Sequence, residues 1–331
     1  MAQRSRARLI HTVSREEQGT RLDLLVAAWL ARELDEPLSK SAVRRLIMAG
    51  AIRLDGHPLR RPGAIVGVEA RLEAVIDRAR LDRAAGGGAA VETTGLAILF
   101  EDDDLLAVAK PSGLAMHATA DPRRSDLFNA LRRLLAERGG QRDAGAALPY
   151  LGLHHRLDAD TSGVVLFTRR ERANAGLARQ FAQGEVTKVY RAIVSRPRHE
   201  VPRRWRVENR LAMGGSGRTA CMQEAAVGTR AATAFAILES LPAALLVEAR
   251  PETGRKHQIR AHLAGSHLPI LGDTRYGGSS RAGRCVAPRV MLHAFTLSLR
   301  HPLTGAPLTI TCPYPPDFTS LLARLRRPAV Y

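Results

Sequence analysis

The sequence is poor in cysteine. Its 331 residues contain three, Cys221, Cys285 and Cys312, which lie far apart and form no CxxC pair. A disulfide framework and a zinc site both require closer and more regular spacing, so the sequence indicates neither. The low cysteine content suits a reducing compartment.

The sequence also lacks long apolar runs. No run approaches the roughly 20 residues that a membrane-spanning helix needs. The first ten residues are basic and contain no apolar segment of the kind found in secretory signal peptides. We therefore expect a cytoplasmic protein that does not enter a membrane.

Acidic residues are scarce relative to basic ones. Lys and Arg together number 50 and Asp and Glu 32, which gives a net charge of +18 at pH 7. Such an excess favours a polyanionic partner, and nucleic acid is the simplest one. The alternative is that the excess reflects an arginine-rich composition throughout. The length suffices for one large domain and a small one.

The first quarter of the chain predicts two helices and a hairpin. Apolar residues recur twice at helical spacing, and the second run is followed by a hairpin turn and by alternating apolar residues. The predicted elements are a loosely ordered basic arm (1–17), a helix from Arg21 to Pro37, a helix from Ser39 or Ser41 to Gly50, a strand (51–54), an Asp55-Gly56 turn and a strand from Val66 to Leu72.

Basic side chains crowd into this small unit, and we expect them to contact RNA phosphates. Phosphate contacts position an RNA rather than specify its sequence. The alternative is a basic helix face that is merely solvated. The residues concerned are Lys40, Arg44, Arg45, Arg53, Arg60 and Arg61.

The small unit resembles the RNA-binding module named after ribosomal small-subunit protein four. The resemblance covers residues 18–76 and rests on Arg21-Leu22-Asp23, Ser39-Lys40-Ser41 and Gly50-Ala51-Ile52. It implies an RNA-binding domain. Residues 77–94, which include three consecutive glycines, predict a flexible linker to the rest of the chain.

Residues 95–331 predict one larger domain of the α+β class. We expect its fold to be a mixed, mostly antiparallel sheet flanked by helices. The predicted strands are 96–100, 105–109, 164–167, 187–194, 231–238 and 244–249, with two more within 196–222; the predicted helices are 125–137, 171–183 and one that opens at Thr253 or Gly254.

A polar loop precedes the most apolar of these strands. Arg156, Asp158 and Thr161 lie in the loop, and residues 164–167 read as a buried strand opened by Gly163. Catalytic groups are commonly mounted where a rigid strand joins a polar loop. Considered alone, an aspartate in such a loop is more often a turn or cap residue.

The string His-Arg-Leu-Asp-x-x-Thr-Ser-Gly at residues 155–163 resembles the catalytic motif of the RluA-type RNA pseudouridine synthases. Other family motifs follow in the right order. They are Lys110-Pro111-Ser112-Gly113, Lys188-Val189-Tyr190-Arg191-Ala192, the Thr-Gly-Arg-x-His-Gln-Ile-Arg string at 253–260, and Gly272-Asp273-x-x-Tyr276-Gly277. The resemblance spans nearly the whole chain and implies an isomerase that converts uridine to pseudouridine in structured RNA without a cofactor or metal.

The resemblance also implies roles for individual residues. Asp158 would do the chemistry, Arg255 would form an ion pair with it, and Tyr190 would pack on the base and remove the final proton. Arg156 and Leu157 would hold the space that an extruded base vacates. The remaining predicted substrate contacts are His155, Thr161 and Arg260, together with Lys110 and Lys188 as phosphate or structural contacts.

Metal binding is not indicated by the histidines of this region. His257 and His262 are five residues apart, whereas two ligands stacked on one helix face lie four apart. We expect these histidines to hold backbone or RNA groups instead.

Several functions remain open on the sequence alone. The first is a synthase acting on 23S ribosomal RNA, with transfer RNA as the alternative substrate. The others are a non-catalytic RNA-binding or ribosome assembly factor on the same fold, and an RNA N-glycosidase that would release free uracil. We expect a monomer whose choice of RNA depends on the weakly patterned segments 138–148, 196–222 and 278–288.

Overall fold

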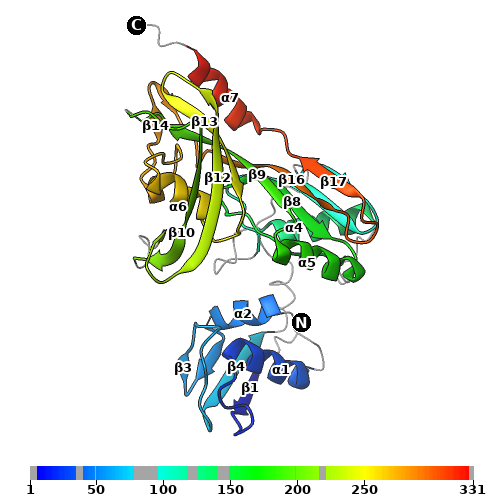
Figure 1. Cartoon of the computed structure of the whole chain (residues 1–331). Coiled ribbons are helices and arrows are strands. Elements are labelled where there is room, and N and C mark those ends of the chain that lie inside the picture. The colour runs from blue at the N-terminus through cyan, green and yellow to red at the C-terminus, as the bar shows by residue number, and fades with distance from the viewer. Residues whose placement is uncertain are drawn as a thin grey trace, which may run out of the picture. The chain divides into compact units, whose positions relative to one another are not determined.

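A computed structural model divides the chain into two compact units (Figure 1), Met1–Glu92 with His117–Ala130 and Thr93–Met116 with Leu131–Tyr331. The structure describes residues 6–34, 40–48, 50–77, 96–117, 126–139, 149–197, 199–215 and 221–327. Nearly all of the predicted linker lies outside these ranges, so the domain boundaries remain a prediction. Among the described residues, no helix combines the length and the apolarity that crossing a membrane requires.

The smaller unit contains an antiparallel sheet with the strand order β1-β4-β2-β3 and, among its described residues, the two helices α1 and α2. Trp29 and Leu30 of the first helix and Ile47 of the second are buried against Ile52 and Leu72 of the sheet. The elements are β1 (Arg6–Thr12), α1 (Leu22–Leu34), α2 (Lys40–Met48), β2 (Ile52–Leu54), β3 (His57–Pro58) and β4 (Arg71–Asp77).

The helices and the hairpin of this unit are confirmed. Asp55 (φ 49°) and Gly56 (φ 81°) take the left-handed conformations that a two-residue hairpin turn requires. Residues 6–12 are not the loosely ordered arm that we predicted, because they form β1, which pairs with β4 along its whole length. The predicted strand from Val66 begins only at Arg71, because Glu69 has a φ of 64°, which interrupts extended backbone.

The larger unit is built on one eleven-stranded sheet, which confirms the predicted mixed, mostly antiparallel arrangement. The strand order is β11-β10-β12-β13-β9-β16-β8-β6-β5, with β17 beside β16 and β7 beside β8. The strands are β5 (Ile98–Glu101), β6 (Leu105–Lys110), β7 (Gly152–Leu153), β8 (Ser162–Thr168), β9 (Thr187–Ser195), β10 (Arg204–Gly214), β11 (Cys221–Glu224), β12 (Thr229–Ser240), β13 (Ala244–Pro251), β16 (Leu292–Arg300) and β17 (Pro307–Thr311). A separate ribbon pairs β14 (Arg281–Ala282) with β15 (Cys285–Val286).

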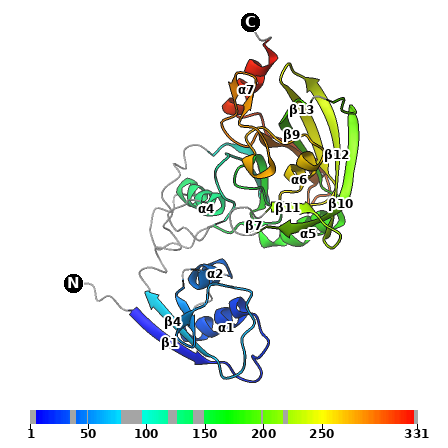
Figure 2. The same cartoon turned by 90° about the vertical axis from the view of Figure 1, so that its left-hand side faces the viewer.

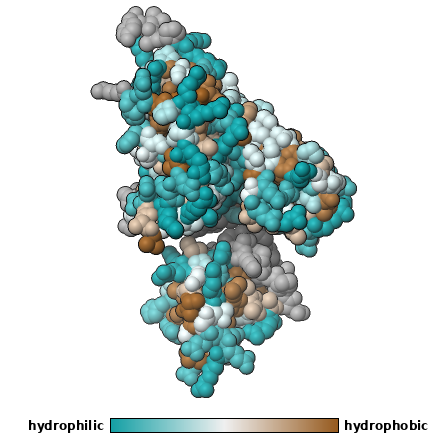
Figure 3. Space-filling view, in the orientation of Figure 1, coloured by the Kyte–Doolittle hydropathy of each residue, from teal (hydrophilic) through white to brown (hydrophobic). Residues whose placement is uncertain are grey.

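Helices flank this sheet. Helix α6 packs against β11, β12 and β13, and Figure 2 shows it in front of these strands. The outer surface over β10 and β12 is mainly hydrophilic (Figure 3) and carries exposed ion pairs such as Arg206–Glu252 and Arg230–Glu208. The remaining helices are α4 (Leu127–Arg138), α5 (Asn174–Gln183), α6 (Gln258–Gly265) and α7 (Pro316–Arg326), with short 3₁₀ turns η2 (Glu171–Ala173) and η4 (Thr274–Tyr276).

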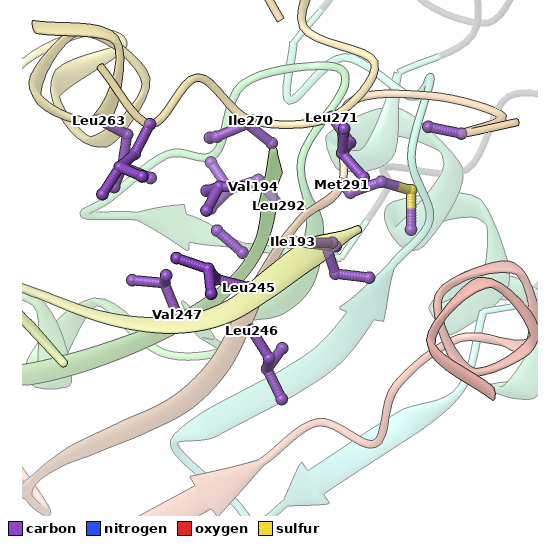
Figure 4. Packing of buried hydrophobic residues seen from close by; sticks show 14 of the residues in the cluster. Ile193, Val194, Leu245, Leu246, Val247, Leu263, Ile270, Leu271, Met291 and Leu292 are labelled. Atoms are coloured by element: carbon purple, nitrogen blue, oxygen red, sulfur yellow. The ribbon is translucent and has the colours of Figure 1, made fainter. Parts of the chain in front are cut away.

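A buried apolar cluster of the larger unit joins the sheet to α6 and to α7, which contributes Phe318. Figure 4 shows Ile193 and Val194 of β9, Val247 of β13 and Leu263 of α6 within one buried cluster. Ile193 and Val194 are consecutive in β9 and point to opposite faces of the sheet. Burial of Leu263 and of side chains such as Val247 stabilises α6 on one face, since each contributes about 1.5–3 kcal/mol by leaving water. The segment that precedes α6 is thereby held over the sheet as well.

One junction in the sheet is parallel. Strands β8 and β16 pair in parallel over Gly163 and Ala294, whereas the other described pairs are antiparallel. Gly163 has a φ of 127°, and a Cβ added there would lie 2.2 Å from the carbonyl oxygen of Ala294. Glycine is therefore required where the predicted catalytic loop enters β8.

A row of directly paired residues continues from this junction across the sheet. Gly163 pairs with Ala294, which also pairs with Tyr190, and Tyr190 pairs with Ala249. Residues that pair directly point to the same face. The residues that pair with Tyr190 on this face of the sheet are therefore small.

We predict that Gly163→Ala destabilises the protein by about 2–5 kcal/mol, because it combines a steric clash with an unfavourable φ. Gly184→Ala is the matched control, since Gly184 also has a positive φ (74°) but nothing lies within 4 Å of its added Cβ. The control should lose only about 1–2 kcal/mol in urea unfolding. Equal losses for the two variants would contradict the close approach of β8 and β16.

Candidate active site

The larger unit contains a cavity of about 620 Å³. This volume lies within the usual range for small-molecule sites, about 300–1,000 Å³. Its walls come from segments far apart in the sequence, which the sheet and α6 bring together. They are the loop 154–161, residues 181–190 around the start of β9, the turn 251–260 that leads into α6, and Leu292 of β16.

The loop that carries Asp158 is anchored from behind by Lys110. The Lys110 side chain is buried, and its amine donates hydrogen bonds to the carbonyl oxygens of Pro111 (2.8 Å), Leu114 (2.7 Å) and Ala159 (2.9 Å). A charged lysine has three N–H donors, which match these three acceptors. Burial lowers the pKa of Lys110 to about 7, while the charges of Asp160 and Asp158 act in the opposite direction.

Asp158 points into the cavity between two nitrogen-bearing side chains. Arg260 Nη1 lies 3.6 Å from Oδ2, and His257 Nε2 lies 3.7 Å from Oδ1. Burial raises the pKa of Asp158, while the positive charges of Arg260, Arg156 and Lys256 lower it in part. The carboxylate therefore depends on its cationic neighbours to remain ionised.

The orientation of Arg260 is set by a second carboxylate. Its Nε and Nη2 each donate to Asp273, both at 2.7 Å, and its guanidinium lies 5.0 Å from the centre of the Tyr276 ring. Bidentate pairing restricts the guanidinium to one plane. The remaining nitrogen, Nη1, is thereby directed at Asp158.

Arg255 does not occupy the predicted position at a helix start beside Asp158. Helix α6 begins at Gln258, and His257 just before it has a φ of 53°, outside the helical region. The Gln258 side chain accepts hydrogen bonds from Thr253 Oγ1 (2.6 Å) and Arg255 N (3.0 Å), which closes a turn here. Arg255 Nε donates to the carbonyl of Arg230 instead (3.0 Å), so Arg260 supplies the ion pair expected from Arg255.

Tyr190 lies in the cavity wall on β9. Burial, reinforced by the negative charge of Asp158, raises the pKa of Tyr190 well above its usual value. Its hydroxyl is therefore neutral at physiological pH. The structure thus brings together Asp158, Tyr190 and Arg260 around one cavity.

The other predicted substrate contacts divide into two groups. Arg156 is exposed and lines the cavity. Lys188 also lines the cavity but is partly buried, and burial lowers its pKa. Leu157 also lines the cavity but is only 4% exposed, so it cannot enter a base stack without moving. Lys110 is not among the lining residues, which excludes the phosphate contact that was one of its two predicted roles.

His155 and Thr161 support the loop from inside. His155 Nε2 accepts a hydrogen bond from Leu166 N (2.9 Å), and its ring stacks on Phe181. Burial lowers the pKa of His155 to about 3, so its ring is neutral. Thr161 is buried, and its backbone N–H donates to the Asp158 carbonyl (3.1 Å). Both residues line the cavity but already have protein partners.

In the smaller unit, the predicted RNA contacts are partly described. Arg53, Arg60 and Arg61 are exposed. Arg44 is about half exposed and pairs with Asp23 (3.0 Å). The side chains of Lys40 and Arg45 lie outside the described residues. Contact of this unit with RNA remains a prediction.

His262 has protein partners on both ring nitrogens. Nδ1 lies 3.0 Å from Thr233 Oγ1 and Nε2 lies 3.1 Å from Asn209 Oδ1, which ties α6 to β12 and β10. Burial lowers the pKa of His262 to about 4. Within the part of the chain that the structure describes, no three His, Cys, Asp or Glu side chains are grouped to hold a metal ion.

Neither Asp273 nor Tyr276 was predicted from the sequence to have a role of its own. Arg260 and Asp273 are 13 residues apart and belong to different elements, so no helical or strand periodicity links them. The one available signal was the Gly-Asp-x-x-Tyr-Gly string itself. Only the fold shows that it surrounds the arginine beside Asp158.

The chain belongs to the RNA pseudouridylate synthase family, whose profile matches residues 104–265. It is similar to the ribosomal large subunit pseudouridine synthase D of Xylella fastidiosa, with 32% identity over 95% of this chain and 92% of that protein. The corresponding protein of Vibrio vulnificus is 30% identical over 97% of this chain and 95% of its own length. The protein is thus an isomerase of the pseudouridine synthase type.

Solved structures that resemble this chain are also named as pseudouridylate synthase domain proteins. The human protein RNA Pseudouridylate Synthase Domain Containing 4 aligns with a TM-score of 0.54 and 27% identity, covering 69% of this chain and 92% of that one. A second human protein, RNA Pseudouridylate Synthase Domain Containing 1, aligns with the same TM-score, 25% identity and 72% of this chain. Both support the sheet-and-helix architecture described above.

We predict that Lys110→Met destabilises the protein by about 2–4 kcal/mol, because buried carbonyl oxygens lose their donor. Lys188→Met is the matched control and should change stability by less than about 1 kcal/mol, since Lys188 lines a cavity and its charged form is disfavoured by burial. Urea unfolding measures both. A mild effect of Lys110→Met would show that its amine does not anchor the Asp158 loop.

Proposed function

We propose that this protein converts specific uridines to pseudouridine in 23S ribosomal RNA and that Asp158 is its catalytic carboxylate. The observation that carries the proposal is the position of Asp158 in a cavity, facing Arg260 and sharing the cavity wall with Tyr190. The names of its relatives, ribosomal large subunit pseudouridine synthases, support the choice of RNA. Action as a cytoplasmic monomer is part of the same proposal.

The reaction breaks the bond between uracil N1 and the ribose anomeric carbon, turns the base, and joins its C5 to that carbon. It involves no net redox change. Asp158 would act either as a nucleophile on the anomeric carbon or as a base that removes a neighbouring ribose proton to give a glycal. Both routes start from the ionised carboxylate.

Arg260 would keep Asp158 ionised while the base and sugar exclude water from the cavity. Burial alone favours the neutral acid, and a guanidinium 3.6 Å away opposes this effect. Arg260 is itself buried and fixed by Asp273, so it needs little rearrangement when RNA binds. We therefore assign to Arg260 the role that the sequence suggested for Arg255.

Tyr190 would pack on the uracil ring. Tyr190 lines the cavity, where a planar base could reach its ring. Because the raised pKa keeps the phenol protonated, packing is favoured over direct removal of the C5 proton. Arg156, exposed at the cavity, would occupy the space left when the uridine leaves its stack, a step that costs a few kcal/mol.

We predict that the pseudouridine content of the RNA depends on Asp158. Deleting this protein should remove pseudouridine from discrete 23S sites, and the wild-type protein should restore them while Asp158→Ala does not. Asp160→Ala in the same loop is the matched control, because its side chain is exposed and does not line the cavity. Pseudouridine mapping of ribosomal and transfer RNA provides the measurement.

Other outcomes would contradict parts of this proposal. If pseudouridine is lost from transfer RNA alone, the substrate is transfer RNA and not ribosomal RNA. An unchanged map with retained RNA binding would favour an assembly factor, and free uracil in the reaction would favour a glycosidase. Full rescue by Asp158→Ala would contradict the role of Asp158.

The pH dependence of activity distinguishes Arg260 from Arg255 as the cation that keeps Asp158 ionised. The proposed reaction needs ionised Asp158, so the rate falls as the pH drops through the pKa of the Asp158 carboxyl. Without Arg260 that pKa rises, by about 1–3 units for a close cation. The acid limb of the pH–rate profile should therefore move to higher pH in Arg260→Gln.

This variant should be combined with Asp273→Asn, because a buried charge without its partner costs about 3–5 kcal/mol. Arg255→Gln is the matched control and should leave the acid limb in place. A shift in Arg255→Gln and none in the double variant would reverse our assignment.

A further inference from the structure

His257 bridges Asp158 and a tyrosine that lies outside the cavity wall. Its Nε2 faces Asp158 Oδ1 at 3.7 Å, and its Nδ1 lies 3.0 Å from the hydroxyl of Tyr276. The His257 side chain is only 8% exposed, and its ring meets the Tyr276 ring edge-on. Tyr276, His257 and Asp158 therefore form a continuous line of polar groups that ends at the carboxylate.

The partners of Tyr276 determine which nitrogen of His257 carries the proton. The backbone N–H of Met222 in β11 donates to the Tyr276 oxygen (2.8 Å), so that oxygen already accepts one hydrogen bond. The Tyr276 O–H is then free to donate to His257 Nδ1. In the resulting tautomer Nδ1 is an acceptor, and the proton resides on Nε2, where it faces Asp158.

The opposite tautomer is disfavoured at both ends. With the proton on Nδ1, the Tyr276 oxygen would accept two hydrogen bonds, and no described partner would receive its own proton. At the other end, the lone pair of Nε2 would face the negative Oδ1 of Asp158. Electrostatic repulsion at one end and a lost hydrogen bond at the other both favour Nε2–H.

His257 acts here as a neutral ring. Burial lowers its pKa to about 4, the nearby charges of Arg260, Lys256 and Arg275 act in the same direction, and Asp273 opposes them. Above pH 5 the ring is uncharged, so its effect on Asp158 comes from a directed N–H group.

We propose that Tyr276 and His257 form a positioning pair for Asp158, in which the Tyr276 hydroxyl fixes the His257 tautomer and His257 Nε2–H orients the carboxylate through Oδ1. Arg260 faces the other oxygen, so each carboxylate oxygen has its own donor. A distance of 3.7 Å is long for a hydrogen bond, but catalytic contacts often shorten when substrate binds. The inference rests on the catalytic role proposed for Asp158.

Single-turnover rates on RNA, measured against pH together with RNA affinity, test this proposal. His257→Leu removes the donor, and Tyr276→Phe removes the hydroxyl but keeps the ring against Arg260. Each should slow the reaction on the order of tenfold at neutral pH, as expected for one hydrogen bond to a charged group. Each should also move the acid limb to higher pH, because ionised Asp158 has lost a donor.

Two comparisons make the test specific. His257→Gln returns an N–H donor near the Nε2 position and should recover most of the rate and the wild-type acid limb. Tyr150→Phe is the matched control, because the Tyr150 oxygen also accepts an N–H, from Asn174, but Tyr150 does not line the cavity. It should behave like the wild type. RNA affinity should remain within about twofold in all four variants, since none of the groups changes net charge above pH 5.

The proposal fails if His257→Leu and Tyr276→Phe keep the wild-type rate and acid limb. It also fails if they lose rate equally at every pH, since that result indicates a structural role. The Asp158→Asn variant distinguishes a failure of the positioning pair from a failure of the proposed function. An active Asp158→Asn overturns the function itself, whereas an inactive Asp158→Asn with wild-type-like His257 variants overturns only the positioning pair.

Discussion

The site depends on one buried ion pair, between Arg260 and Asp273. A carboxylate enclosed in a cavity tends to take up a proton, and Asp158 would lose its ionised form without a nearby cation. Arg260 supplies that cation only because Asp273 holds two of its nitrogens and leaves the third directed at Asp158. Asp273, which does not line the cavity, therefore sets the position of the cation beside Asp158, which does.

The sheet provides the frame for this arrangement. Gly163 allows β8 to approach β16 in parallel, and the loop carrying Asp158 enters the sheet at that junction. Lys110 holds the loop from behind through backbone carbonyls. The turn before α6 brings His257, and the first turn of α6 brings Arg260, to the two oxygens of Asp158. Rigid elements thus position each polar group before RNA binds, which reduces the reorganisation needed during the reaction.

Much of the fold could be predicted because local patterns determine it. Residues 164–167 form a buried strand, and Asp55-Gly56 forms a hairpin turn, as their residue types indicate. Strand β1 was missed because its partner β4 lies some 65 residues further along the chain. The choice between Arg255 and Arg260 could not be made from sequence either, because it depends on the left-handed His257 and on Asp273. The backbone acceptors of Lys110 are likewise invisible in a sequence.

The ionisation of Asp158 can be measured directly. We would titrate its side-chain carboxyl carbon by ¹³C NMR in the wild type, assigning the signal by its loss in Asp158→Asn. The account predicts a pKa above the ordinary value of 3.8 and a further rise when Arg260 and Asp273 are replaced together. A pKa at or below 3.8 that does not respond to the loss of Arg260 would show a solvated carboxylate and contradict the central claim.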